Sequence, residues 1–228
     1  EITNFNGTHK ELPFINVANY LRRCGIKVPQ IYRYFDEEHL MVLEDIGDGL
    51  MARLVEKASD DVRREWYGRA IDLLVEIQER TSSSEPSACV ALRRSFDATL
   101  LNWEFDHFVE YGIEARLGKK MTEEDLKIFT DETRKITSKI EKMKYGFTHR
   151  DFQSRNMLIR DNELYLIDFQ DALLAPAPYD LATLLGDRDT PSVIDRRLEE
   201  RLLAYYANAW AARGGSPWQP EELWDVYA

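Results

Sequence analysis

The chain has 228 residues, of which 30 are lysine or arginine and 41 are aspartate or glutamate, so its formal net charge is −11. The apolar share of 44% excludes an intrinsically disordered polymer, and a chain of this length can bury a core without metals or disulfides. No apolar run is long enough to span a membrane. The acidic balance argues against a general nucleic-acid binder, although it would also attract a cationic substrate. With only Cys24 and Cys89 and no leader segment, we expect a reduced, cytoplasmic protein.

The first part of the chain predicts a small unit of one helix and one hairpin. Apolar residues recur at helical spacing from Phe14 onward, and Gly25 ends that helix. Residues 28–35 and 39–44 are rich in strand-forming residues on either side of a short turn. The two glycines of 46–49 then predict a linker.

Most of the remaining chain is predicted to be helical, interrupted by one β-rich island. A capping box at Thr122 and the Thr190–Pro191 pair, an N-cap followed by proline at N1, mark two of the helix starts. Residues 146–169 form the island. It holds three strand-like pieces, around Phe147, 157–159 and 164–167, and the last two form a hairpin. The predicted helices cover residues 50–57, 60–80, 96–117, 122–143, 179–187 and 190–213.

Polar side chains gather at the ends of these short strands. His149, Asp151 and Asn156 lie in the stretch FTHRDFQSRN, and Asp168 follows Asp151 by 17 residues, across the hairpin. A phosphoryl-transfer site needs one carboxylate to accept or orient the proton of the attacking hydroxyl. It also needs a carboxylate and an amide oxygen to hold Mg²⁺ against the phosphates. The spacing therefore predicts a kinase-type site at the island.

The kinase pattern H-R-D-L-x-x-x-N, followed by an aspartate on the far strand of a hairpin, fits both stretches. HRDF at 149–152 with Asn156 matches the first part, and IDF at 167–169 matches the second, with Gln170 in place of glycine. A hinge-like segment, LEDI at 43–46, precedes them at the end of a predicted strand. Kinases offer adenine a backbone carbonyl and, two residues on, a backbone N–H at such a hinge.

Together with YDLA at 179–182, these motifs resemble the aminoglycoside phosphotransferase and choline kinase superfamily of protein-kinase-like folds. Within it they are most similar to the bacterial anomeric sugar kinases, which phosphorylate the 1-hydroxyl of N-acetylmuramate or N-acetylglucosamine. The resemblance covers about residues 14–213. It implies an α+β, protein-kinase-like fold with a largely helical C-terminal lobe and a truncated N-terminal lobe. Residues 1–48 would be the remnant of the small nucleotide-binding lobe and hinge, and residues 49–228 the helical catalytic and substrate lobe.

The resemblance also implies the roles of individual residues, with ATP and Mg²⁺ as the cofactors. Asp151 would be the catalytic base, His149 would brace the loop, and Asp180 would anchor the loop without acting as a reagent. The implied binding residues are Glu44, Ile46 and Asp48 for the nucleotide and Asn156 and Asp168 for Mg²⁺.

Two features depart from the family pattern. Residues 1–13 contain no glycine-rich phosphate loop, and Lys10 lies on no predicted strand, so neither Glu11 nor Asn16 is assigned as a partner for a strand lysine. The chain begins with glutamate rather than methionine and stops within an apparent helix. We therefore expect either a longer gene product or a fragment that is not an active kinase.

Several further residues have a functional and a structural interpretation. Trp103, Glu104 and His107 are interpreted either as a substrate wall or as the solvated face of an ordinary amphipathic helix. Arg155 is interpreted either as a phosphate contact or as a surface arginine. Asp171 is interpreted either as a third carboxylate beside the metal or as an exposed turn residue.

The sequence thus predicts an ATP-dependent small-molecule kinase that transfers the γ-phosphoryl group to a hydroxyl. An amino sugar of the N-acetylmuramate or N-acetylglucosamine type is the preferred acceptor. The alternatives are an aminoglycoside- or choline-type phosphotransferase and a catalytically silent kinase-like binding module. We expect no nucleic-acid or membrane partner, and the oligomeric state is not readable from the sequence.

Overall fold

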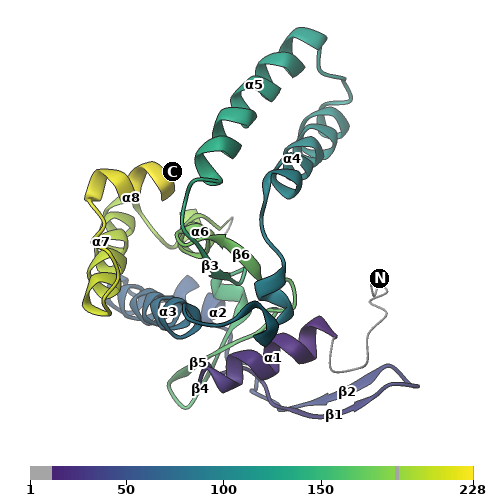
Figure 1. Cartoon of the computed structure of the whole chain (residues 1–228). Helices are drawn as coiled ribbons and strands as arrows, with labels where there is room; N and C mark the ends of the chain where they lie inside the picture. The colour runs from purple at the N-terminus through teal and green to yellow at the C-terminus, as the bar shows by residue number, and fades with distance from the viewer. Residues whose placement is uncertain (1–11, 188–189, 228) are drawn as a thin grey trace.

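The computed structural model describes residues 12–187 and 190–227, with an α+β architecture of helices and three short antiparallel strand pairs (Figure 1). Lys10 and Glu11 lie outside the described residues. No helix in the described part of the chain is long and apolar enough to cross a membrane. Cys24 and Cys89 are both free thiols, as predicted.

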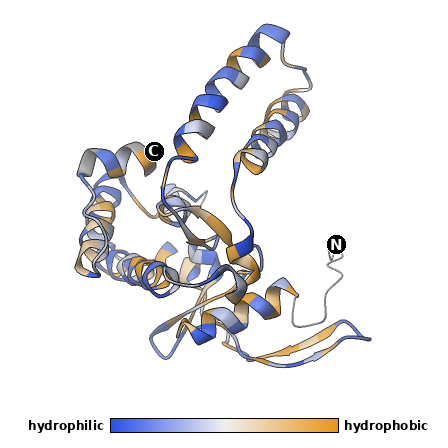
Figure 2. Ribbon diagram, viewed as in Figure 1, coloured by the Kyte–Doolittle hydropathy of each residue, from blue (hydrophilic) through white to orange (hydrophobic). Residues whose placement is uncertain are grey.

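The N-terminal unit consists of one helix and one hairpin, as predicted. Helix α1 (Pro13–Arg23) buries its apolar side, and Gly25, with φ of 75°, lets the chain leave the helix. Strand β1 (Ile31–Phe35) pairs antiparallel with β2 (Leu40–Leu43). The first strand starts later than predicted because Pro29 has no N–H for the ladder. Figure 2 shows that this hairpin, which extends from the body, is largely hydrophobic.

The core of the body lies between α3 (Asp60–Thr81) and α7 (Arg196–Ala212), which pack along each other. A polar chain crosses this core: the Tyr206 hydroxyl donates to Gln78 Oε1 at 3.1 Å, and Gln78 Nε2 donates to the Ala177 carbonyl at 2.7 Å. The helices around this pair are α2 (Met51–Glu56), α6 (Tyr179–Gly186) and α8 (Pro220–Tyr227).

A two-helix arm projects away from this body (Figure 1). The helix predicted from residue 96 begins two residues later, because the Asp97 side chain accepts a hydrogen bond from the Leu100 N–H and caps the helix there. Its second half is π-helical, which the sequence pattern did not indicate. Thr122 is the N-cap of the next helix, as predicted. The arm comprises α4 (Ala98–His107), the π-helical segment η4 (Phe108–Ala115) and α5 (Glu123–Ile140).

The three strands predicted for the β-rich island are confirmed, and a fourth strand follows the island. The predicted hairpin is confirmed: β4 (Met157–Arg160) and β5 (Glu163–Leu166) join through a two-residue turn whose residues both have positive φ. Strand β3 (Tyr145–Thr148) pairs instead with β6 (Leu173–Pro176), which was not predicted. β6 is short and ends in proline, so its sequence resembles a loop.

The start of the last long predicted helix was wrong. Thr190–Ser192 form only a short 3₁₀ turn, η6, and α7 begins at Arg196. The Asp195 side chain accepts a hydrogen bond from the Leu198 N–H at 2.8 Å, so the true N-cap follows the predicted one by five residues. The described part of the chain also contains the short 3₁₀ turns η2 (Pro86–Ala88), η3 (Val90–Arg93) and η5 (Ser154–Asn156).

Candidate active site

Strand register brings the two predicted catalytic motifs together. β4 and β5 pair with Met157 opposite Leu166, so the residues that flank the hairpin, Asn156 and Ile167, are neighbours. The Ile167 N–H donates to the Asn156 carbonyl at 3.0 Å. Asn156 and Asp168 therefore emerge at the same end of the hairpin.

His149 ties the loop after β3 to this end of the hairpin. Its side chain is fully buried, and its Nε2 donates to the Ile167 carbonyl at 2.9 Å, since a carbonyl can only accept. The Phe152 ring packs edge-on against the imidazole, with 6.0 Å between ring centroids. Burial lowers the pKa of His149 to about 4, so the ring is neutral near pH 7.

Asp180, at the start of α6, holds the same loop from the other side. Its carboxylate accepts hydrogen bonds from the backbone N–H of His149 at 2.7 Å and of Arg150 at 3.0 Å. These bonds stabilise Arg150 with φ of 77°, a left-handed conformation that a non-glycine residue rarely adopts. Burial raises the pKa of Asp180 to about 7. The contacts are those of the predicted anchor.

Asp151 is the exposed carboxylate of the loop. Its backbone carbonyl accepts a hydrogen bond from Asn156 Nδ2 at 2.8 Å, which fixes the first aspartate of the motif relative to its asparagine. Partial withdrawal from water raises the pKa of Asp151. The charges of Asp168 and Asp171 raise this pKa further, and Arg150 lowers it. The negative charges of Asp168 and Asp171 therefore act on the Asp151 carboxylate.

Asn156 and Asp168 have the chemistry to hold Mg²⁺. The Asn156 side-chain nitrogen donates to the Asp151 carbonyl, so the side-chain oxygen of Asn156 is the atom left to bind a ligand. Asp168 has φ of 65°, and Gln170, at the position where glycine was expected, donates to its Oδ1 at 2.8 Å. Among the described residues, no group of three or more His, Cys, Asp or Glu side chains is arranged to hold a metal alone. A Mg²⁺ ion here would complete its shell with water and phosphate oxygens, as this ion commonly does.

The arm contacts the catalytic loop through Glu104. The Glu104 carboxylate accepts a hydrogen bond from Arg150 Nη2 at 3.1 Å, and the Arg150 guanidinium also lies over the Phe96 ring, 5.8 Å from its centroid. Burial raises the pKa of Tyr179, and the charges of Glu104 and Asp151 both contribute to this rise. Glu104 therefore lies in the same electrostatic environment as Asp151.

Two of the other candidates, His107 and Arg155, have partners within the protein. His107 is exposed in the arm, stacked on Trp103 at 4.4 Å and packed against Tyr111 at 4.6 Å. Arg155 pairs with Asp187 at 3.4 Å, so the structure gives it a structural partner. Asp171 is an exposed turn residue whose charge still acts on Asp151.

Side-chain and backbone hydrogen bonds both hold the hinge segment in place. Glu44 accepts hydrogen bonds from Arg160 at 2.7 Å and from the Gln30 N–H at 3.1 Å, and these contacts lower the pKa of Glu44. The Ile46 side chain is buried and Asp48 is exposed. The predicted backbone contacts of Glu44 and Ile46 to adenine remain a prediction.

Comparison with known proteins identifies the family. Residues 9–218 match the phosphotransferase enzyme family. The chain belongs to this family. As a phosphotransferase-family chain it is 26% identical, over 87% of its length, to the N-acetylmuramate/N-acetylglucosamine kinase of Pseudomonas aeruginosa. It is 31% identical, over 76% of its length, to the protein of the same name in Caulobacter vibrioides. These matches cover 56% and 49% of the relatives, so the chain spans about half the length of the curated relatives it matches.

Solved structures confirm the predicted protein-kinase-like fold. The gentamicin–APH(2")-IIa complex matches with a TM-score of 0.62 at 17% identity, covering 90% of this chain and 70% of that one. The choline kinase LicA from Streptococcus pneumoniae matches with a TM-score of 0.59 at 17% identity, covering 97% of this chain and 75% of that one. At these identities the likeness concerns the fold of this phosphotransferase-family chain.

Sequence reasoning missed two arginines that shape the site. Arg150 entered the sequence analysis only as the arginine of the HRD motif. Its left-handed backbone depends on a contact from α6, and its ion pair depends on Glu104 of α4. Arg160 follows the predicted strand 157–159 and was assigned no role. Its contact with Glu44 joins positions separated by 116 residues. No local sequence signal marks either contact.

Proposed function

We propose that the protein is an ATP-dependent kinase that transfers a γ-phosphoryl group to a hydroxyl of an amino sugar. The observation that supports this most directly is the convergence of Asp151, Asn156 and Asp168 at one end of the β4–β5 hairpin, with Glu104 of the arm paired to the neighbouring Arg150. The division at residue 48 into a nucleotide-binding part and a catalytic part, and a cytoplasmic location, belong to the same proposal.

Asp151 is suited to orient the acceptor hydroxyl. Its carboxylate is exposed, and its raised pKa makes it a better proton acceptor than an ordinary aspartate. The acceptor oxygen attacks the γ-phosphorus, its proton passes to Asp151, and the bond to the β-phosphate oxygen breaks to release ADP. Mg²⁺ held by Asn156 and Asp168 would supply neutralisation of the phosphate charge. Positioning and electrostatics provide most of the catalysis.

The arm offers a surface for a sugar acceptor. Trp103 and Tyr111, with exposed fractions of 51% and 57%, stack with His107 in a ladder beside Glu104. Such rings pack against the apolar face of a sugar, while a carboxylate such as Glu104 accepts hydrogen bonds from its hydroxyls. The names of the curated relatives favour N-acetylmuramate or N-acetylglucosamine as that sugar.

Substitution of Asp151 tests the catalytic assignment. In the Asp151→Asn variant we expect phosphoryl transfer to fall at least about a hundredfold while ATP still binds, because only the proton acceptor is lost. Turnover close to that of the wild type would refute the role of Asp151.

A coupled assay for ADP release tests the acceptor. N-acetylmuramate and N-acetylglucosamine are compared with choline and kanamycin. Turnover with the sugars supports the proposal, and turnover with only the amines overturns the sugar assignment. Absence of turnover and of calorimetric Mg·ATP binding by the longest natural form would favour a silent binding module.

A further inference from the structure

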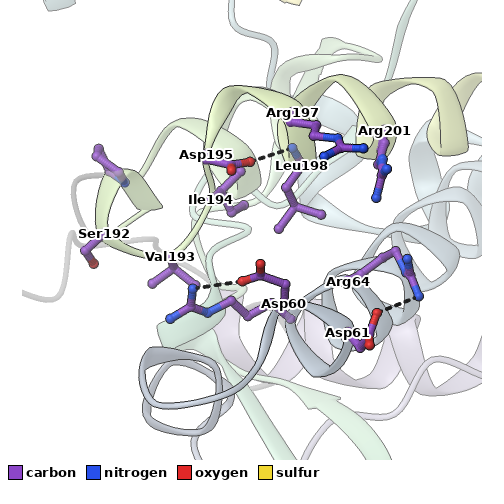
Figure 3. Close-up of a pocket in the computed structure, with 12 residues that line it drawn as sticks. Asp60, Asp61, Arg64, Ser192, Val193, Ile194, Asp195, Arg197, Leu198 and Arg201 are labelled. Carbon is purple, nitrogen blue, oxygen red and sulfur yellow. Dashed lines mark hydrogen bonds and ion pairs between the residues drawn. The ribbon is translucent and has the colours of Figure 1, made fainter.

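The second site that the structure offers is a cavity of about 400 Å³ between the first turns of α3 and of α7. It is lined by residues of both helices and of segment 191–195, and none of the predicted catalytic residues borders it (Figure 3). Val193, Ile194 and Leu198 provide apolar wall, and both helices direct their positive N-terminal ends toward it.

The polar lining has four arginines, three aspartates and one serine, although the chain carries a net charge of −11. Arg63 is used structurally, because it donates to the carbonyls of Val55 at 3.0 Å and Glu56 at 3.1 Å. The other three arginines at the cavity are Arg64, Arg197 and Arg201.

These three arginines form a like-charged group. Arg197 and Arg201 lie one turn apart on α7 and, among the described residues, neither forms a hydrogen bond or ion pair. Arg64 reaches toward Arg201 from the opposite wall, on α3, and has a single ion pair, with Asp61 at 3.0 Å (Figure 3). Like charges at this helical spacing destabilise a helix. A bound anion would convert this cost into a favourable interaction.

The carboxylates at the cavity do not compensate for this group. Asp195 is used as the N-cap of α7, and Asp60 lies 3.5 Å from Arg63, so Asp61 is the one carboxylate that pairs with any of the three arginines. The guanidinium fork matches phosphate oxygens in a bidentate geometry. We propose that this cavity binds a small anion with two or more phosphate groups, held by Arg64, Arg197 and Arg201.

Calorimetry with pyrophosphate, on the whole chain in a Mg²⁺-free buffer of low ionic strength, tests the proposal. We expect one binding site in the wild type. In the double variant Arg197→Gln/Arg201→Gln we expect the affinity to fall at least about tenfold, because two charge-assisted contacts are lost. The Arg197→Lys/Arg201→Lys variant, which keeps the charge and is less prone to misfold, should bind with intermediate affinity.

A matched control is Arg116→Gln/Arg134→Gln, which removes two charges from exposed arginines of the arm. It should bind pyrophosphate within about twofold of the wild type. Equal losses in both double variants, no uptake at millimolar pyrophosphate, or equal affinity for sulfate would each overturn the proposal.

Discussion

Arg160 on β4 donates a 2.7 Å hydrogen bond to Glu44, which lies 116 positions earlier in the chain. A second nitrogen of the same guanidinium donates to the Asp45 carbonyl at 3.2 Å. One side chain therefore holds the hinge segment against the catalytic hairpin. The proposed adenine contacts and the proposed phosphoryl-transfer residues are thereby kept in a fixed relation.

We expect the Arg160→Gln variant to loosen this relation. The KM for ATP should rise about three- to tenfold with little change in kcat, because hinge position affects nucleotide binding more than the chemical step. Initial rates at varied ATP measure this. The control is Arg213→Gln, which breaks another arginine–glutamate pair, with Glu79 at 2.8 Å, on a distant surface. A fall in kcat with unchanged KM would contradict the prediction.

The stability of the protein should depend on pH through Asp180 and His149 with opposite signs. Folded Asp180 keeps its proton to its pKa of about 7, above the unfolded value of about 3.9, so its stabilisation is full at low pH and is lost as pH rises. Folded His149 has a pKa of about 4, below the unfolded value of about 6.5, so its stabilisation is full above pH 6.5 and is lost as pH falls. Between about pH 4 and pH 6.5 the effects of Asp180 and His149 on stability largely cancel.

Replacing either Asp180 or His149 makes the pH dependence caused by the other residue measurable. As pH falls from 6.5 to 4.5, the Asp180→Asn variant should lose about 1 kcal/mol per pH unit more than the wild type, since only His149 still titrates. The His149→Gln variant should show the opposite trend and gain relative stability. Urea unfolding at several pH values measures both. Parallel curves for all three proteins would show that neither residue has the shifted pKa.

The aromatic ladder should contribute to acceptor binding. The Trp103→Ala variant should raise the KM for the sugar about three- to tenfold with a smaller effect on kcat, because a stacking surface is lost. Phe108→Ala is a matched control, since Phe108 is also exposed in the arm, at 54%, but packs on Phe129 at 6.2 Å. Equal effects of both variants would indicate a general disturbance of the arm.

The polar chain in the core should be sensitive to loss of one hydroxyl. In the Tyr206→Phe variant, Gln78 Oε1 loses its buried donor, so the free energy of unfolding should fall by about 1–3 kcal/mol. Chemical denaturation measures this change. Tyr205→Phe, which removes a surface hydrogen bond to Asp72 at 2.9 Å, should change stability by less than about 0.5 kcal/mol. A stability equal to that of the wild type in the Tyr206 variant would contradict the assigned bond.

The helices and the kinase-type motifs could be predicted from the sequence because each is specified by residues close together in the chain. A periodic apolar stripe predicts α3 from within its own length, and the spacing of Asp151, Asn156 and Asp168 identifies a kinase-type hairpin. Where two local signals competed the prediction failed, as at Thr190, where the cap at Asp195 starts α7 instead.

The sequence by itself determined the family, the catalytic pattern and most helices of this protein. Only the tertiary structure decided the pairing of β6 with β3, the left-handed Arg150 stabilised by Asp180, and the placement of Arg64 and Arg201 on the walls of one cavity. The physical reason is that each of these depends on groups far apart in the chain. Their energies come from burial and electrostatic contact, which no short stretch of residues specifies.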